Sequence, residues 1–299
     1  MTATLLKDPG HPYAETKNIS FTYHAQQESP ALFGYDYFIS LPPSYNTSPS
    51  TRYSLILFLH GAGESQRAEN ESYASIRHGI PKIILCYDKL KSGMNAPSID
   101  IPQALRIRKS PGKVSDRSSE PVDSEVCSLL AENFITVTPS LDMRHGYGWN
   151  ASVLSALLDE VVTTYRVDVD AVHVTGFSMG GYRTWALGIH SPARFASLMP
   201  VCGGGDSVLA RHITHVPQWV HHGESDDVIP VSASEKMVSS LRNKGAREVK
   251  LTKYPDLKHD SWTEAYANKE VYEWMLGCRR RTKGEEIVVP EANKVAVAG

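Results

Sequence analysis

Short apolar runs alternate with amphipathic segments along most of the chain. The clearest run is Tyr53–Leu59, YSLILFL, which contains no charged residue and is typical of a strand that is covered on both faces of a sheet. Similar runs predict seven further strands, at residues 18–24, 35–41, 134–138, 171–175, 196–201, 218–221 and 249–254. The repeated change of period argues for a fold built from layers of strands and helices.

Four amphipathic patterns between or after these runs predict helices. Asn150 is a favourable N-cap for the first, which carries Val153, Leu154 and Leu157 among its apolar residues on one face. The other three cover residues 179–190, 232–243 and 262–276. Strands that alternate with helices predict an α/β fold class, with a mostly parallel central sheet, flanking helices and right-handed crossovers.

Two segments depart from this rhythm. Residues 87–127 are rich in serine, proline and charge and show no sustained period, which predicts an inserted lid-like segment, a binding loop or disorder. From Arg279 onward the chain reads as a polar tail. We therefore expect a single domain over residues 1–278, with an insertion at about 87–127 and a tail at 279–299.

Composition narrows the classes of protein that fit. The 299 residues are 41% hydrophobic and 21% charged, as in ordinary globular proteins. The net charge of −2 gives no overall attraction to nucleic acid or to an anionic membrane. The four cysteines are scattered and form no CxxC pair, the N-terminus has no apolar core, and no run approaches 18 apolar residues. These features predict a soluble, cytoplasmic protein without a membrane span. The oligomeric state is left open.

The sharpest chemical signal is the segment 176–181, GFSMGG, which contains the pattern G-x-S-x-G. It follows one predicted strand and opens a predicted helix. In that setting, glycines permit a tight turn that exposes the hydroxyl of the central residue, Ser178. We therefore expect Ser178 to be a nucleophile.

A serine nucleophile needs a base and a carboxylate that orients the base. His259 follows the strand predicted at 249–254, and Asp226, Asp227 and Glu224 follow the strand predicted at 218–221. Serine, acid and histidine thus come in the order and at the strand ends that this type of site requires. From the residues alone, any of the three carboxylates could be the acid.

Two backbone N–H groups are expected to stabilise a developing oxyanion. One belongs to Met179, directly after the nucleophile, and the other to Ala62 in the small-residue loop after Tyr53–Leu59. His212 and His215 have a spacing that metal ligands use, but no nearby cysteine or carboxylate completes a set. We expect neither a metal nor an organic cofactor.

At these residues the chain resembles the α/β-hydrolase superfamily. The segments FLHGAGE, VTGFSMGGYRTW, HHGESDDVIP and KHDSWTEAY are similar to motifs of small serine esterases of the phospholipase/carboxylesterase and dienelactone-hydrolase-like group, which includes predicted peptidases and feruloyl-esterase-like enzymes. The resemblance implies that the acid is the third residue after the glycine of its loop, which is Asp226. The long insertion and Lys258, where a glycine often precedes the histidine, are departures from the pattern.

The resemblance implies hydrolysis of a small-molecule carboxylic ester or thioester through an acyl-enzyme on Ser178. Amide or peptide hydrolysis, and a non-hydrolytic lyase or cyclase reaction, are the alternatives. Tyr147 and Trp149 follow the strand predicted at 134–138, so these two residues and Trp262 are expected to line an apolar or aromatic substrate pocket. The alternative is that the three aromatic rings pack the loops against one another.

Overall fold

The computed structural model describes residues 17–25, 34–67, 71–99, 117, 120–143 and 148–281. Within this part of the chain, eight strands form one sheet in the order β1-β2-β4-β3-β5-β6-β7-β8. Strand β2 is antiparallel to its neighbours β1 and β4, and the pairs from β4 to β8 are all parallel. The strands are β1 Ser20–His24, β2 Asp36–Leu41, β3 Tyr53–Leu59, β4 Phe134–Ser140, β5 Val167–Phe177, β6 Ser197–Val201, β7 Gln218–Gly223 and β8 Val249–Tyr254. The predicted α/β class with a mostly parallel sheet is confirmed.

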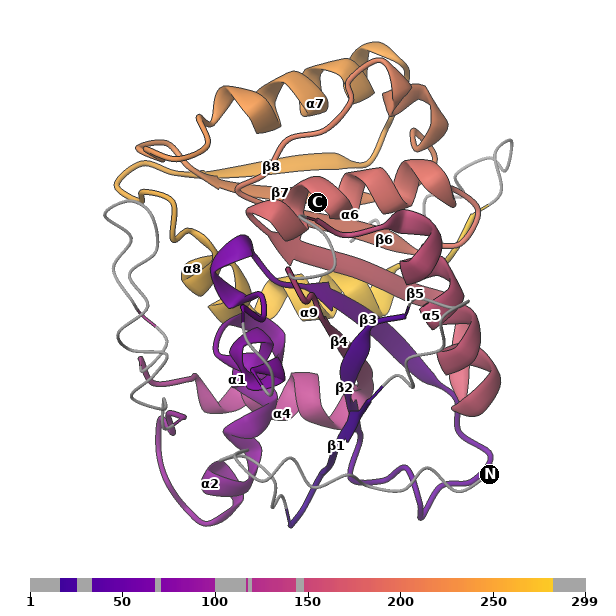
Figure 1. Cartoon of the computed structure of the whole chain (residues 1–299), viewed down its shortest axis with the longest axis vertical. Coiled ribbons are helices and arrows are strands. Elements are labelled where there is room, and N and C mark those ends of the chain that lie inside the picture. Colours follow the sequence, from indigo (N-terminus) through magenta and orange to yellow (C-terminus); the bar gives the residue numbers. More distant parts are fainter. Residues whose placement is uncertain are drawn as a thin grey trace, which may run out of the picture.

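Helices cover both faces of this sheet (Figure 1). They are α1 Gly79–Leu85, α2 Tyr87–Lys91, α4 Ser124–Asn133, α5 Ala151–Thr164, α6 Met179–His190, α7 Ser232–Asn243, α8 Trp262–Ala267 and α9 Lys269–Gly277, with short 3₁₀ helices at Ala62–Glu64, Ser72–Ile76 and Leu209–His212. No helix in the described ranges is long and apolar enough to cross a bilayer.

Strand β3 lies between two separate hydrophobic cores. Leu55, Leu57 and Leu59 point into the core that contains helices α5, α6 and α7. Ile56 and Phe58 point into the other core, which contains α1, α4, α8 and α9. Successive side chains of a strand alternate between the two faces of the sheet. A strand that is buried on both faces therefore needs apolar residues at nearly every position. This requirement explains the continuous run YSLILFL.

Most predicted elements lie within two residues of their predicted bounds, and three predictions need correction. The strand predicted at 171–175 is longer, since β5 covers Val167–Phe177. The helix predicted at 262–276 is two helices, because Asn268 ends α8 and caps α9 by accepting a hydrogen bond from the Glu270 N–H at 3.0 Å. The segment 87–127, predicted without regular structure, contains α2 and the first residues of α4. Positions 100–116 and 118–119 of that insertion lie outside the described residues. Helix α1 was not predicted either.

Candidate active site

Parallel strands bring the predicted chemical segments to one edge of the sheet. Ser178 follows β5, Asp226 lies three residues after β7, and His259 follows β8. The loop that contains Ala62 follows β3, which pairs directly with β5. Because β3, β5, β6, β7 and β8 all run in the same direction, these loops share the carboxyl edge, where open α/β sheets bind their ligands.

Ser178 occupies a strained turn between β5 and α6. Its backbone has φ 54° and ψ −119°, a positive φ that costs a non-glycine residue on the order of 1–3 kcal/mol. The adjacent elements are close: a Cβ atom on Gly176 would lie 2.5 Å from the Leu59 carbonyl oxygen, and one on Gly180 would lie 1.9 Å from it. Glycine is therefore required at both positions, which is the physical content of the G-x-S-x-G pattern here.

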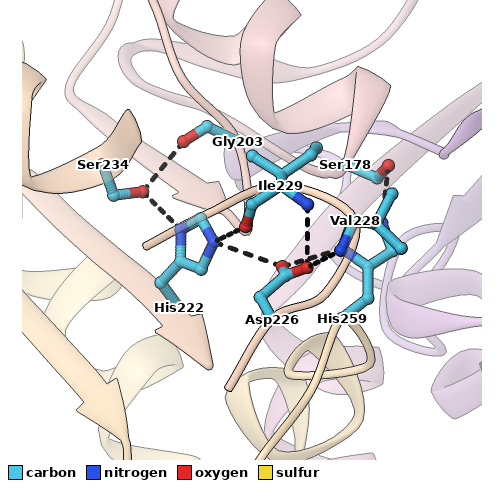
Figure 2. A network of polar contacts seen from close by, with 8 residues as sticks. All are labelled: Ser178, Gly203, His222, Asp226, Val228, Ile229, Ser234 and His259. Carbon is cyan, nitrogen blue, oxygen red and sulfur yellow. Dashed lines mark hydrogen bonds and ion pairs between the residues drawn. The ribbon is translucent and has the colours of Figure 1, made fainter. Parts of the chain in front are cut away.

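A continuous line of hydrogen bonds joins Ser178, His259 and Asp226 (Figure 2). His259 Nε2 lies 3.0 Å from Ser178 Oγ, and His259 Nδ1 lies 2.8 Å from Asp226 Oδ2. The other two candidate acids lie elsewhere: Asp227 pairs with Lys258 at 3.4 Å, and Glu224 pairs with Lys253 at 2.7 Å. The structure thus brings together the three residues that the resemblance selected.

The Asp226 carboxylate is surrounded by donors. Its Oδ1 accepts from the N–H groups of Val228 and Ile229, both at 2.9 Å. Its Oδ2 lies 2.8 Å from the His259 ring and 3.2 Å from the His222 ring. Burial by itself would raise the pKa of Asp226, but the hydrogen bonds from the two histidines and the two N–H groups outweigh it and hold the pKa well below its usual range. The group is therefore a carboxylate across the neutral range.

The thiol of Cys202, the Asp226 carboxylate and the His259 ring lie within 4.8 Å of one another, the one cluster of three metal-ligating types among the described residues. Hydrogen bonds already occupy both Asp226 oxygens and both His259 nitrogens. Burial raises the pKa of Cys202 well above its usual value, so it stays a neutral thiol. The cluster offers no free set of ligands.

The loop after β3 is held from within the core. Ala62 opens a 3₁₀ helix and Met179 opens α6, and the N–H of the first residue in a helix has no partner inside that helix. The His60 side chain fixes the loop through Nδ1, 2.7 Å from the Gly61 carbonyl, and Nε2, which accepts from the Leu141 N–H at 3.1 Å. Burial lowers the pKa of His60 to about 4, so its ring is neutral at pH 7.

The loop also carries a buried ion pair. Glu64, the last residue of the 3₁₀ helix, accepts from Arg77 Nη2 at 2.9 Å, with both side chains at most 5% exposed. A buried pair is costly to break, because the remaining charge is left without a partner. Glu64 was not singled out by the sequence.

The three aromatic residues expected to line a pocket have different positions. Trp149 is only 2% exposed and donates its indole N–H to the His60 carbonyl at 3.3 Å, so it belongs to the core and supports the loop after β3; the prediction that it lines a pocket is wrong. Trp262 stacks on Phe177 at 4.4 Å and meets the His259 ring edge-on at 5.4 Å, so it packs against His259. Tyr147 lies outside the described residues.

An open groove of about 540 Å³ extends from Ser178 along the start of α6. Its lining residues are Ser178, Met179, Tyr182, Arg183, Ala186, Gly205, Asp206 and Ile229. Arg183 forms no ion pair within the described ranges, and Tyr182 is 40% exposed. Tyr182 and Arg183 were not predicted to line the site. Helical spacing could have indicated Tyr182, because it lies four residues after Ser178 and so returns to the same face of the helix.

Parts of the chain resemble known proteins in sequence, and most of it resembles known proteins in fold. Residues 140–270 match the model of the phospholipase/carboxylesterase family. A segment of 122 residues is 26% identical to a bifunctional acetylxylan esterase/xylanase from Neocallimastix patriciarum, covering 38% of this chain and 18% of that protein. The chain thus spans less than a fifth of the length of this curated relative.

Two solved structures illustrate the fold. A thermostable esterase superposes with a TM-score of 0.59 and 22% identity, over 88% of this chain and 64% of that one. A ferulic acid esterase gives a TM-score of 0.54 and 14% identity, over 86% and 96%. The protein therefore has the α/β-hydrolase fold that the sequence motifs implied, and its segment 140–270 matches the phospholipase/carboxylesterase family.

Proposed function

We propose that this protein is a serine hydrolase that cleaves a carboxylic ester or thioester of a small molecule through an acyl-enzyme on Ser178. The observation that carries the proposal is the hydrogen-bonded line from Asp226 through His259 to Ser178 Oγ, which ends at an open groove. The relatives named as esterases point to the same chemistry. In this proposal the three residues form a catalytic triad.

The first half of the reaction forms the acyl-enzyme. Asp226 accepts a hydrogen bond from the Nδ1–H group of His259, which leaves the bare Nε2 as the base toward Ser178. Ser178 Oγ then attacks the ester carbonyl as Nε2 takes its proton. The tetrahedral oxyanion accepts hydrogen bonds from the N–H groups of Ala62 and Met179, each worth about 10²–10³ in rate in comparable sites. His259 returns the proton to the leaving alcohol or thiol.

The second half releases the acid. A water molecule enters from the groove, and His259 removes its proton as the water oxygen attacks the acyl carbonyl carbon. The tetrahedral intermediate then collapses: the bond from the acyl carbon to Ser178 Oγ breaks, His259 returns the proton to Oγ, and the free acid leaves. Amide hydrolysis would use the same groups, but its leaving amine must be protonated more completely. Turnover of an amide without any ester turnover would favour that reaction.

The near-neutral charge of the chain, −2 overall, accords with a small-molecule substrate, and we propose a cytoplasmic location without nucleic-acid partners.

The test combines covalent labelling with turnover. Wild type, Ser178→Ala and Ser239→Ala are treated with a fluorophosphonate probe and assayed with short- and long-chain p-nitrophenyl esters. Ser239 lies on the exposed side of α7, so its variant is the matched control. We expect labelling and turnover in wild type and in Ser239→Ala, and a loss of about 10⁶ in kcat in Ser178→Ala. Equal labelling in all three proteins would refute the proposed nucleophile, and labelling without ester turnover would favour the lyase or cyclase alternative.

A further inference from the structure

A second histidine contacts the carboxylate that orients His259. Figure 2 shows His222 on the opposite side of Asp226 from His259. We propose that His222 is a buried, permanently protonated imidazolium that acts through Asp226 as a positioning residue and keeps His259 unprotonated. This inference deepens the proposed function and rests on it where catalysis is concerned. The charge of His222 is a separate, directly measurable property.

The surroundings of His222 consist of hydrogen-bonding atoms. The residue lies near the end of β7, and its side chain has no exposed surface. Its Nδ1 lies 2.7 Å from the hydroxyl of Ser234, which comes from α7. Its Nε2 lies 2.9 Å from the Ile229 carbonyl oxygen and 3.2 Å from Asp226 Oδ2. Both ring nitrogens are therefore engaged.

A count of hydrogen atoms fixes the protonation of the ring. The Ser234 hydroxyl donates its single hydrogen to the Gly203 carbonyl oxygen at 2.8 Å, because a carbonyl can only accept. Toward His222 Nδ1, Ser234 therefore presents a lone pair, and Nδ1 must carry a hydrogen. The second nitrogen, Nε2, faces only a carbonyl and a carboxylate, so it must carry one too. A ring protonated at both nitrogens is an imidazolium.

A neutral ring would leave one of these buried contacts without a hydrogen. If Ser234 instead donated to Nδ1, its oxygen would face the Gly203 carbonyl at 2.8 Å with no hydrogen between them. Buried polar groups in native proteins are almost always paired. The imidazolium satisfies every contact in Figure 2 at once and balances the charge of the buried Asp226 carboxylate.

This cation has a consequence for His259. The two rings contact the same oxygen, Asp226 Oδ2, at 3.2 Å and 2.8 Å. A positive charge this close disfavours a second positive charge, so His222 opposes protonation of His259 in the free enzyme.

The other charged or titratable groups near this pair do not replace His222. The thiol of Cys202, after β6, stays neutral. Lys253, which faces His222 in the β7–β8 register, pairs with Glu224 at 2.7 Å and with Glu235 of α7 at 3.3 Å.

Asp260, directly after His259, also titrates near neutral pH, because burial raises its pKa to about 6. It is present in wild type and in every variant below, so its contribution cancels in the comparison.

The first experiment measures the charge of His222 without reference to catalysis. Nitrogen NMR of the full-length protein, labelled at the histidine rings, distinguishes protonated from bare ring nitrogens, and His222→Gln assigns the signal. We expect His222 to show two protonated nitrogens that persist from about pH 6 to pH 9. A bare nitrogen on His222 at pH 7 would overturn the inference. If wild type hydrolyses no ester but this signal is present, the proposed function fails and the charge assignment stands.

The second experiment measures the effect on the base. The acidic limb of the pH profile of kcat/KM reports the essential base of the free enzyme. In His222→Gln, which keeps an amide donor but loses the charge, we expect this limb to move up by about one pH unit. The matched control is His221→Gln: His221 is the adjacent residue, is equally buried, and contacts Tyr254 on the other face of β7. Its limb should stay in place.

A second variant keeps the test valid if His222→Gln does not fold. Ser234→Ala removes the acceptor for the Nδ1 hydrogen and favours a neutral His222, so its limb should move in the same direction by a smaller amount. If kcat falls while the limb is unchanged in both variants, His222 has only a structural role, and the inference that it tunes His259 is wrong.

Discussion

The turn that carries Ser178 leaves no room for a side chain at Gly180, and this provides a quantitative test of the site. A Cβ atom there would lie 1.9 Å from the Leu59 carbonyl oxygen and 2.9 Å from the His60 carbonyl oxygen. Real Cβ atoms essentially never approach other heavy atoms more closely than 3.0 Å. In Gly180→Ala, the start of α6 must therefore move away from the end of β3 by about 1 Å, since packed backbone does not compress.

This displacement changes the geometry that the proposed mechanism needs. Ser178 and Met179 directly precede Gly180, and Leu59 and His60 lead into the loop of Ala62. The nucleophile and one oxyanion donor thus move relative to the other donor. A misplacement of about 1 Å can cost on the order of 10² in rate. We expect Gly180→Ala to lose about 10² in kcat/KM for p-nitrophenyl acetate and about 1–3 kcal/mol in the free energy of unfolding.

Two other glycines supply graded controls. In Gly188→Ala, on the same helix, the new Cβ meets the Leu198 side chain at 2.6 Å; a side chain can rotate away, so stability falls but kcat/KM per folded molecule stays unchanged. In Gly277→Ala nothing lies within 4 Å, and stability should rise by about 0.5–1 kcal/mol. Urea unfolding and initial rates normalised to titrated active sites measure both quantities. Unchanged kcat/KM in folded Gly180→Ala would refute the reasoning.

Three further predictions concern charge, specificity and helix capping. Burial raises the pKa of Asp260 to about 6, so the folded protein loses free energy of unfolding as the pH rises from about 4 to about 6. Asp260→Asn keeps the acceptor for the Thr263 N–H and cannot ionise. In urea unfolding it should be up to about 3 kcal/mol more stable than wild type at pH 7.5, and the gain should be much smaller at pH 4.5. Arg183→Ala should raise KM about tenfold for a p-nitrophenyl ester whose acyl chain ends in a carboxylate and leave KM unchanged for its methyl-ended counterpart. Asn150→Ala removes the cap that accepts from the Ser152 and Val153 N–H groups and should lower the free energy of unfolding by about 1 kcal/mol, whereas Asn150→Asp should retain most of it.

The strands and the three hydrogen-bonded residues Ser178, His259 and Asp226 could be predicted because each is indicated by the few residues around it in the sequence. The run Tyr53–Leu59 reflects burial on both faces, and each of Ser178, Asp226 and His259 follows a strand. Parallel pairing then brings the three together at one sheet edge, although Ser178 and His259 are 81 residues apart. Once the strands are known to be parallel, the positions of these residues after their strands are enough to predict that they share one edge of the sheet.

The choice among the candidate acids needed more than the local signal. Asp226, Asp227 and Glu224 lie in one loop, and their residue types do not separate them. What distinguishes Asp226 is that the loop folds back so that the Val228 and Ile229 N–H groups point at its carboxylate. The resemblance to known motifs supplied this choice, whereas spacing alone did not.

The roles of buried aromatic and histidine side chains depend on what covers each face of the sheet. Trp149 follows a strand, as a pocket residue would, but the fold buries it against His60. His221 and His222 are adjacent, and neither has exposed surface. Strand alternation predicts only that they point to opposite faces. What each ring contacts is set by distant parts of the chain. His222 lies against Ser234, 12 residues away on α7, and contacts Asp226, whereas His221 lies against Tyr254, 33 residues away on β8. A strand buried on both sides therefore reveals which of its residues share a face, but the chemistry of that face depends on the elements packed against it.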